Sequence, residues 1–268
     1  MTFKMALIQL IVVDDKETNL KSTEIKIRET ASKGAKVIVL PEMFNCPYHN
    51  DNFPKYAEEY PGITTNMLSN LSKELGIYIF GGSIPEKEKG NIYNTCYCFG
   101  PKGDLLGKHR KVHLFDVDIK GGISFKESDV LFRGNSATVF DTEFGRVGVA
   151  ICYDMRFPEI IRKMTLEGAE MIVVPAAFNM TTGPAHWHIL ARTRALDNQV
   201  YMVLSSQARN TKGVYTAYGH SLVASPWGDI IQELGEGEGI LYVDIDLEYV
   251  QKVRAELPLL KHRRTEVY

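Results

Sequence analysis

Short apolar runs rich in β-branched residues alternate with segments of helical periodicity along the whole chain. Continuous apolar strands separated by helices are typical of sheets that are buried under helical layers. The 268 residues contain no linker, low-complexity tract or short-period repeat, and a length near 270 is compatible with one large α/β domain. We therefore expect one α/β domain over residues 1–268, with a tail from about residue 258 that packs at a subunit interface.

The individual elements follow from the local pattern. Helices are expected over 15–32, 64–75, 158–168 and 186–199, and glycines at positions 34 and 76 are suitable helix ends. Apolar and β-rich runs predict strands over 4–12, 35–40, 77–84, 94–100, 146–152, 169–175, 200–207 and 239–246. The segment 218–231 predicts a hairpin with its turn at residues 226–229.

Composition excludes several classes of protein. Lys and Arg number 31 against 33 Asp and Glu, so a nucleic-acid partner is not expected. No apolar stretch is long enough to span a bilayer, and the short apolar N-terminus is interpreted as a strand rather than a signal peptide. Without a targeting signal we expect a cytoplasmic protein with no membrane partner. The four cysteines are expected to be free thiols.

Polar residues of chemical interest follow three of the expected strands. Glu42 follows the run 37–40, Cys152 follows 147–151, and an Asn-containing loop follows 171–178. The carboxyl ends of strands are where α/β proteins usually assemble their sites. These residues are therefore candidates for one common site, although every strand must end in something polar.

Cys152 has two interpretations. A cysteine after an apolar run is commonly a small buried hydrophobe, but a thiolate at the start of a helix is stabilised by the helix dipole. Glu42 is either a solvated carboxylate or the general base for that thiol. Lys111 is either part of the basic run 108–111 or a cation that stabilises a thiolate and an oxyanion.

Histidines offer a rival hypothesis. His109 and His113 are four residues apart, and His186 and His188 flank a tryptophan, so a metal hydrolase could use either pair. No HExxH, GxGxxG, GxxxxGK[ST] or GxSxG motif occurs. A metal site is thus the weaker interpretation, and we expect no metal and no organic cofactor.

The segments VLPEMF, HRKVHLFD and GVAICYDMRFPE resemble the three signature segments of the nitrilase superfamily of carbon–nitrogen hydrolases, in the same order. The resemblance implies a single-domain α-β-β-α sandwich of four layers. It also implies that Glu42 is the general base, Lys111 the cation that holds the oxyanion, and Cys152 the nucleophile. Glu127, in ISFKESD, matches a second glutamate that would orient Lys111 and the water.

A narrower resemblance, carried by PEMFNCPY, SFKES, CYDMRFPE and AAFNMTTGPAHW, is to the omega-amidase branch. That branch hydrolyses the terminal amide of 2-oxo dicarboxylic acid monoamides such as 2-oxoglutaramate and 2-oxosuccinamate, through a cysteine thioester. The alternative is a related amidase acting on deaminated glutathione or an N-carbamoyl amine. A regulatory protein that keeps the fold without turnover is a further alternative, against which the intact triad argues.

Such a reaction needs oxyanion donors and a reader for the substrate's free carboxylate. The backbone N–H of Tyr153 is the expected second oxyanion donor, beside Lys111. Arg156 would reach the same face as Cys152 if the chain turns helically, and a guanidinium binds carboxylates bidentately. The alternative for Arg156 is a surface ion pair with Glu159 or Asp154.

Further pocket residues are expected mainly from the resemblance; they are Phe115, Phe178, Thr182 and, with less support, Tyr48. The expected partners are a small-molecule amide substrate and further copies of the chain, in a homodimer or a larger even assembly. The dimer is likewise implied by the resemblance and not by the residues.

Overall fold

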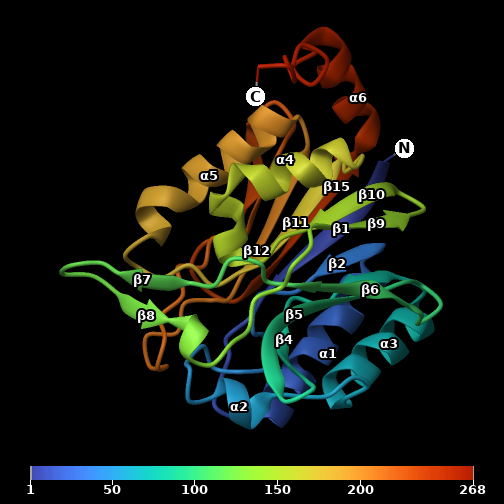
Figure 1. Ribbon diagram of the computed structural model, residues 1–268. Helices are drawn as coiled ribbons and strands as arrows, with labels where there is room; N and C mark the ends of the chain where they lie inside the picture. The colour runs from blue at the N-terminus through green and yellow to red at the C-terminus, as the bar shows by residue number, and fades with distance from the viewer. Residues whose placement is uncertain (1, 268) are drawn as a thin grey trace.

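A computed structural model describes residues 2–267. Two β-sheets pack face to face at its centre, and helices cover both outer faces (Figure 1). The first sheet has the order β15-β1-β2-β3-β5-β4, with β6 paired to β5. Its strands are β1 (Thr2–Gln9), β2 (Val37–Val39), β3 (Tyr78–Phe80), β4 (Ile84–Glu88), β5 (Asn91–Phe99), β6 (Leu105–Arg110) and β15 (Gly239–Asp246).

The second sheet has the order β14-β13-β12-β11-β10-β9. Its strands are β9 (Thr138–Thr142), β10 (Gly145–Val149), β11 (Met171–Ala176), β12 (Tyr201–Ser206), β13 (Leu222–Ala224) and β14 (Ile230–Glu233). A two-stranded ribbon of β7 (Asp116–Asp118) and β8 (Ser124–Lys126) projects from the edge of the molecule (Figure 1).

Helices form the two outer layers (Figure 1). The helices α1 (Lys16–Ser32) and α3 (Ile63–Leu75) pack on the first sheet, and α4 (Pro158–Leu166) and α5 (Gly183–Asn198) pack on the second. The remaining helical segments are α2 (Phe53–Tyr56), α6 (Leu247–Glu256) and the 3₁₀ turns η1 (Glu127–Asp129) and η2 (Cys152–Arg156). The expected α-β-β-α sandwich is confirmed. Within residues 2–267 no helix is long and apolar enough to cross a bilayer.

Local sequence explains where the main helices begin and end. Asp15 caps α1 because its carboxylate accepts the backbone N–H of Thr18 at 2.7 Å. Gly76 ends α3 in the left-handed conformation, as expected of a glycine at that position. The hairpin of β13 and β14 is also confirmed, with antiparallel pairing on either side of the turn.

One expected strand is wrong in a way that matters for the site. Residues 77–84 form two strands, β3 and β4, because the chain turns at Gly81-Gly82. Gly82 has a φ of 54°, and a Cβ at this position would lie 2.1 Å from the carbonyl oxygen of Pro41. Only glycine allows this close approach. The break therefore lets the turn after β2, which carries Glu42, pack against the start of β4.

The carboxyl ends of the central strands of both sheets meet at one side of the sandwich. The strands β1, β2 and β3 run parallel to one another, as do β10, β11 and β12. The hydroxyl of Ser205, at the end of β12, donates to the carbonyls of Ile8 and Val39 at the ends of β1 and β2. Segments that follow these strands are therefore brought together, and the candidate site lies among them.

Candidate active site

Three strands deliver the three expected catalytic side chains to one buried place. Glu42 lies three residues beyond β2, Lys111 follows β6 directly, and Cys152 lies three residues beyond β10. Glu42 and Lys111 are fully buried, and Cys152 is 5% exposed. Polar side chains this deeply buried must be paired with one another. The structure therefore excludes a solvated Glu42 and a surface position for Lys111.

The alternation of side chains along β6 divides the basic run 108–111 between two faces. Lys108 and Arg110 point outward to Glu86, and Arg110 Nε lies 2.7 Å from the Glu86 carboxylate. His109 and Lys111 point inward, to Asp154 and Glu42 respectively. The run therefore does not form one continuous surface patch, and period-2 alternation explains how a lysine within it becomes buried.

Lys111 lies at the centre of a hydrogen-bonded cluster. Its Nζ donates to Glu42 Oε1 at 2.9 Å, to Glu127 Oε1 at 3.0 Å and to the Tyr48 hydroxyl at 3.3 Å. Tyr48 in turn donates to Glu127 Oε1 at 2.5 Å. Asn94 donates to Glu42 Oε1 at 2.8 Å. All three protons of the ammonium group thus have an acceptor, and the cluster is rigid.

Cys152 opens η2 with an unusual backbone. Its φ is 46°, in the left-handed region where non-glycine residues are uncommon. The thiol interacts with the carboxylate of Glu42 and with the backbone of Ala177. Glu42 Oε2 is buried and accepts no hydrogen bond within the described chain. An unpaired carboxylate oxygen beside a thiol is the acceptor that a departing thiol proton requires.

Burial and charge shift the pKa values of this group. Burial raises the pKa of Glu42, and the charge of Glu127 adds to that effect against the opposing charge of Lys111. Burial lowers the pKa of Lys111, but the charges of Glu127 and Glu42 outweigh it and the net pKa is raised. Burial and the charge of Glu42 raise the pKa of the Cys152 thiol. The lysine is therefore cationic, and the thiol is protonated until a base removes its proton.

Glu127 links the cluster to the pocket wall. Its second oxygen, Oε2, accepts the backbone N–H of Phe115 at 2.6 Å. One carboxylate therefore fixes both the lysine and the segment that carries Phe115. Glu127 opens the 3₁₀ turn η1.

Asp154 is a buried carboxylate whose part in the site was not expected. It accepts the backbone N–H of His113 at 2.8 Å and that of Ile151 at 3.0 Å, and it contacts the rings of His109 and His113 at 3.4 and 2.8 Å. Burial raises the pKa of Asp154, but hydrogen bonds from the two histidines outweigh it and hold the pKa well below its usual range. Asp154 thereby joins the segment before Cys152 to the segment after Lys111.

A small pocket opens onto Cys152. The five expected pocket residues all line it, and so do five others; the full lining is Tyr48, Phe115, Cys152, Tyr153, Arg156, Ala177, Phe178, Asn179, Thr182 and Tyr215. Asn179 and Tyr215 are the polar members that sequence reasoning missed. Tyr215 lies in an irregular segment whose sequence carries no catalytic signature, so only the fold reveals it.

Arg156 lies on the pocket wall and is not a surface ion-pair partner. Its guanidinium lies 4.8 Å from the ring centre of Phe178, and Nη1 donates to His186 Nδ1 at 3.0 Å. No ion pair joins it to Glu159 or Asp154 within residues 2–267. Its Nε is buried with no partner in the described chain. A buried, unpaired donor at a pocket wall is available to a ligand.

The histidine pairs of the metal-hydrolase hypothesis do not form. His109 lies on a strand, and both His109 and His113 bind Asp154. His186 and His188 both lie on α5 but have different partners. His186 contacts Arg156, and His188 contacts Glu233. The four cysteines are free and buried, as expected.

Comparison with known proteins places this geometry in a family. The carbon–nitrogen hydrolase family profile matches residues 4–255. The chain is 51% identical to omega-amidase NIT2-B of Xenopus laevis, over 99% of this chain and 96% of that protein. It is 49% identical to omega-amidase NIT2 of Homo sapiens, over 100% and 97%.

A crystal structure gives the same result for the fold. The Saccharomyces cerevisiae protein Nit3, described as a member of branch 10 of the nitrilase superfamily, superposes with a TM-score of 0.90 at 44% identity. The match covers 98% of this chain and 97% of that one. The expected fold and superfamily are both confirmed.

Proposed function

The chain belongs to the carbon–nitrogen hydrolase family, and from that premise we propose that it is an omega-amidase that uses Cys152 as its nucleophile. The substrate is a 2-oxo dicarboxylic acid monoamide, such as 2-oxoglutaramate or 2-oxosuccinamate, and the products are the dicarboxylate and ammonia. The observation that carries the proposal is the buried Glu42–Lys111–Cys152 cluster at the base of a small pocket with Arg156 on its wall. Full-length relatives named omega-amidase support it.

The first half of the reaction forms a thioester. Glu42 accepts the thiol proton on Oε2 while sulfur attacks the amide carbon. Glu42 then gives that proton to the departing nitrogen, the C–N bond breaks, and ammonia leaves. The raised pKa of Glu42 suits a group that must both take and return a proton.

Two donors stabilise the oxyanion in this proposal. The N–H of Tyr153, at the start of η2, has no partner within that 3₁₀ turn. Lys111 supplies the second donor, by releasing its longest hydrogen bond, the 3.3 Å bond to the Tyr48 hydroxyl. Each donor of this kind typically contributes about 3–4 kcal/mol to transition-state stabilisation.

Hydrolysis of the thioester returns the enzyme to its starting state. Glu42 removes a proton from water as the water oxygen attacks the thioester carbon. The C–S bond breaks, the acid departs, and the thiol regains its proton from Glu42. Glu127, held by Lys111 and the backbone of Phe115, orients the lysine and the incoming water.

The pocket favours a short substrate that carries an anion. The pocket beside Cys152 is small, which favours a dicarboxylic monoamide of four or five carbons over a tripeptide derivative. The unpaired Nε of Arg156 and its guanidinium plane provide a bidentate site for the free carboxylate. Burial lowers the pKa of Arg156 without removing its charge, and Phe178 supports one face of the group.

Steady-state kinetics on a substrate panel test the proposal. The panel contains 2-oxoglutaramate, 2-oxosuccinamate, deaminated glutathione, an N-carbamoyl amine and a neutral amide of similar length. We expect ammonia release to be fastest with the two 2-oxo monoamides. Arg156→Ala should lose activity on carboxylate substrates and change little on the neutral amide, and equal losses on both would contradict the assignment of Arg156.

The panel also separates the alternatives. No turnover of 2-oxoglutaramate would exclude the omega-amidase assignment, and preferred turnover of deaminated glutathione or of the N-carbamoyl amine would replace it. Cys152→Ala should abolish hydrolysis of every substrate. A Cys152→Ala protein with full activity would overturn the thioester mechanism itself.

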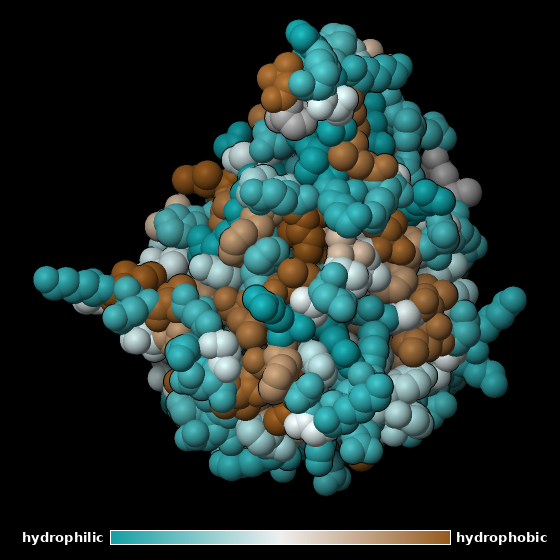
Figure 2. All heavy atoms as spheres, viewed as in Figure 1, coloured by the Kyte–Doolittle hydropathy of each residue, from teal (hydrophilic) through white to brown (hydrophobic). Residues whose placement is uncertain are grey.

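We further propose a homodimer that forms through the outer helical layer of the second sheet. Hydrophobic side chains are exposed there, including Ile189 and Leu196 on α5, at 66% and 42%, and Leu257 near the start of the tail, at 39%. Figure 2 shows hydrophobic atoms interrupting the hydrophilic surface over α5 and near the C-terminal segment. The tail from residue 258 lies beside this surface in the proposed dimer. We also propose a cytoplasmic location.

A further inference from the structure

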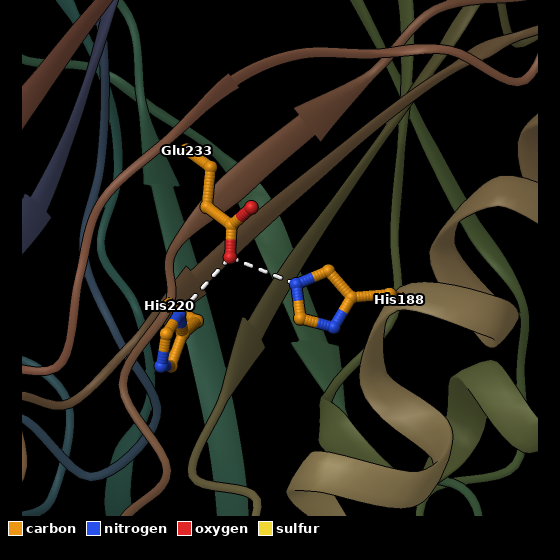
Figure 3. Close-up of side chains that lie close together, drawn as sticks. All are labelled: His188, His220 and Glu233. Atoms are coloured by element: carbon orange, nitrogen blue, oxygen red, sulfur yellow. Dashed lines mark hydrogen bonds and ion pairs between the residues drawn. The ribbon is translucent and has the colours of Figure 1, made fainter.

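Three potential metal ligands lie together outside the pocket (Figure 3). His188 comes from α5, His220 immediately precedes the segment leading to β13, and Glu233 ends β14. Glu233 Oε1 lies 2.8 Å from His188 Nε2 and 3.0 Å from His220 Nδ1, and the three ligand atoms lie within 4.8 Å of one another. None of these residues takes part in the proposed amidase reaction.

The chemistry of this group suits a transition-metal ion. Imidazole nitrogen and carboxylate oxygen are common ligands of Zn²⁺, at about 2.0–2.2 Å from the ion. Two such ligands on one tetrahedral ion are separated by roughly 3.3 Å at those bond lengths. The two histidine nitrogens lie 2.8 and 3.0 Å from Glu233 Oε1 and within 4.8 Å of each other, so an ion can be admitted by side-chain rotations that adjust these three separations.

The backbone around His220 is fixed before any ion binds. Its φ of 60° lies in the left-handed region. Its N–H donates to the carbonyl of Gly235 at 3.1 Å, and its carbonyl accepts the indole N–H of Trp187 at 2.7 Å. The His220 ring stacks on Tyr218 with 4.3 Å between ring centres. Trp187 is fully buried and is the residue before His188. The hydrogen bond from its indole to the His220 carbonyl therefore anchors the backbone beside both histidines.

The three side chains are also accessible. Their exposed fractions are 32% for His188, 25% for His220 and 31% for Glu233. An ion can therefore reach the ligand atoms, and water can occupy its remaining coordination position. Without an ion, His188 Nε2 and His220 Nδ1 each donate a hydrogen bond to Glu233 Oε1. To bind an ion through these atoms, each ring must carry its proton on its other nitrogen. That other nitrogen makes no hydrogen bond within the described chain.

We propose that His188, His220 and Glu233 form a binding site for a divalent transition-metal ion of the Zn²⁺ type. The ion would join α5 to β14 and to the segment before β13, which approach one another from separate parts of the chain. It binds only the folded arrangement of the three ligands, so it stabilises the fold. The site does not depend on the identity of the amide substrate.

Zinc titration tests the site in a Cys152→Ser background, because a cysteine thiol can itself bind zinc. We expect isothermal titration with ZnCl₂ to give one ion per chain, and the melting temperature to rise with zinc. Glu233→Gln keeps the size of the side chain but loses the carboxylate, and His220→Ala loses a ring. Each should weaken zinc binding at least tenfold. Co²⁺ should show the visible absorption of a four- or five-coordinate ion, and both variants should lose it.

His49→Ala is the matched control, since His49 is an exposed histidine with a carboxylate, Asp51, at 3.6 Å. It should bind zinc as tightly as its parent. Circular dichroism and melting without metal establish that each variant is folded, and His188→Ala provides an independent variant if one fails. Undetectable zinc binding to the Cys152→Ser protein, or unchanged binding in folded Glu233→Gln and His188→Ala proteins, would overturn the proposal.

Discussion

At the scale of single residues, the buried cluster contains one more carboxylate than cations. Lys111 lies between Glu42 and Glu127, and all three side chains are fully buried. Isolated charges are costly in such a place. Burial raises the pKa of Glu42 against the opposing charge of Lys111, and the charge of Glu127 adds to the rise.

The first prediction concerns this base. Glu42 must be ionised to accept the thiol proton, so its raised pKa places the acid limb of kcat/KM above about 4.3, the value of an ordinary glutamate. Activity should therefore be lost as pH falls through that higher value. Glu42→Gln should reduce kcat by about 10²–10⁴-fold, the usual contribution of a general base.

Rate profiles against pH for wild type measure the limb, and kcat for Glu42→Gln measures the loss. Glu59→Gln, at an exposed glutamate, is the control and should retain wild-type kinetics. If the acid limb of kcat/KM lies at or below pH 4.3, or if Glu42→Gln keeps the wild-type kcat, the assignment of Glu42 as the base is refuted.

The second prediction concerns His186, which acts through Arg156. His186 Nδ1 accepts a hydrogen bond from Arg156 Nη1 at 3.0 Å and so fixes the guanidinium against the pocket. His186→Ala should raise KM for a 2-oxo monoamide several-fold, with a smaller change in kcat, and leave a neutral amide unaffected. His186→Asn retains an acceptor and should restore KM in part. Equal effects on charged and neutral amides would show that His186 is merely structural.

At the scale of elements, η2 is held from two sides. Asp154 ties it to the segment after β6 through the backbone N–H of His113 at 2.8 Å. Arg194, on α5, donates to the carbonyls of Met155 and Arg156 at 2.9 and 2.8 Å. Cys152, the proposed nucleophile, therefore sits on a turn whose position depends on the segment after β6 of one sheet and on a helix over the other.

The third prediction follows for Asp154. Its pKa is lowered in the fold, so the stability it contributes is complete above about 3.9, its unfolded value, and is lost as pH falls through the lower folded value. Asp154→Asn should lower the free energy of unfolding by about 3 kcal/mol at neutral pH. The difference from wild type should shrink below pH 4.

Urea unfolding at several pH values measures this difference, and kcat reports the displacement of Cys152. Asp51→Asn is the control, because the Asp51 side chain is 80% exposed. A variant as stable as wild type at neutral pH would show that Asp154 does not hold η2 in place.

At the scale of the whole molecule, the two sheets bring segments more than a hundred residues apart into one site, while the outer layers remain free to make other contacts. The exposed apolar side chains of α5 lie on one such layer. An exposed apolar surface of this kind favours association.

The fourth prediction is that the chain has twice its 30.2 kDa mass in solution. Light scattering after gel filtration measures the mass. Leu196→Arg on α5 should shift it toward the monomer, because a buried guanidinium without a partner is unfavourable at an apolar interface. Ile25→Arg, at a 58% exposed position on α1 over the opposite sheet, should leave the dimer intact. A monomeric wild-type protein, or a dimer unaffected by Leu196→Arg, would contradict the proposed interface.

The sequence by itself determined the alternating elements, because burial and backbone propensity leave a local periodic record. The helix limits at Asp15 and Gly76 and the hairpin of β13 and β14 were readable for this reason. The triad residues were identified because they lie in three ordered motifs. The pocket residues were identified mainly through the resemblance.

Only the tertiary structure decided how distant segments meet. The break at Gly82 is a steric contact with Pro41, and the role of Asp154 consists of bonds to residues about forty positions away. The group of His188, His220 and Glu233 likewise joins three separate elements. An element records its burial in the local periodic pattern, and the triad was predicted because its residues lie in ordered motifs. A partner across the fold leaves neither a periodic trace nor a motif, so the contacts that hold the triad could not be predicted.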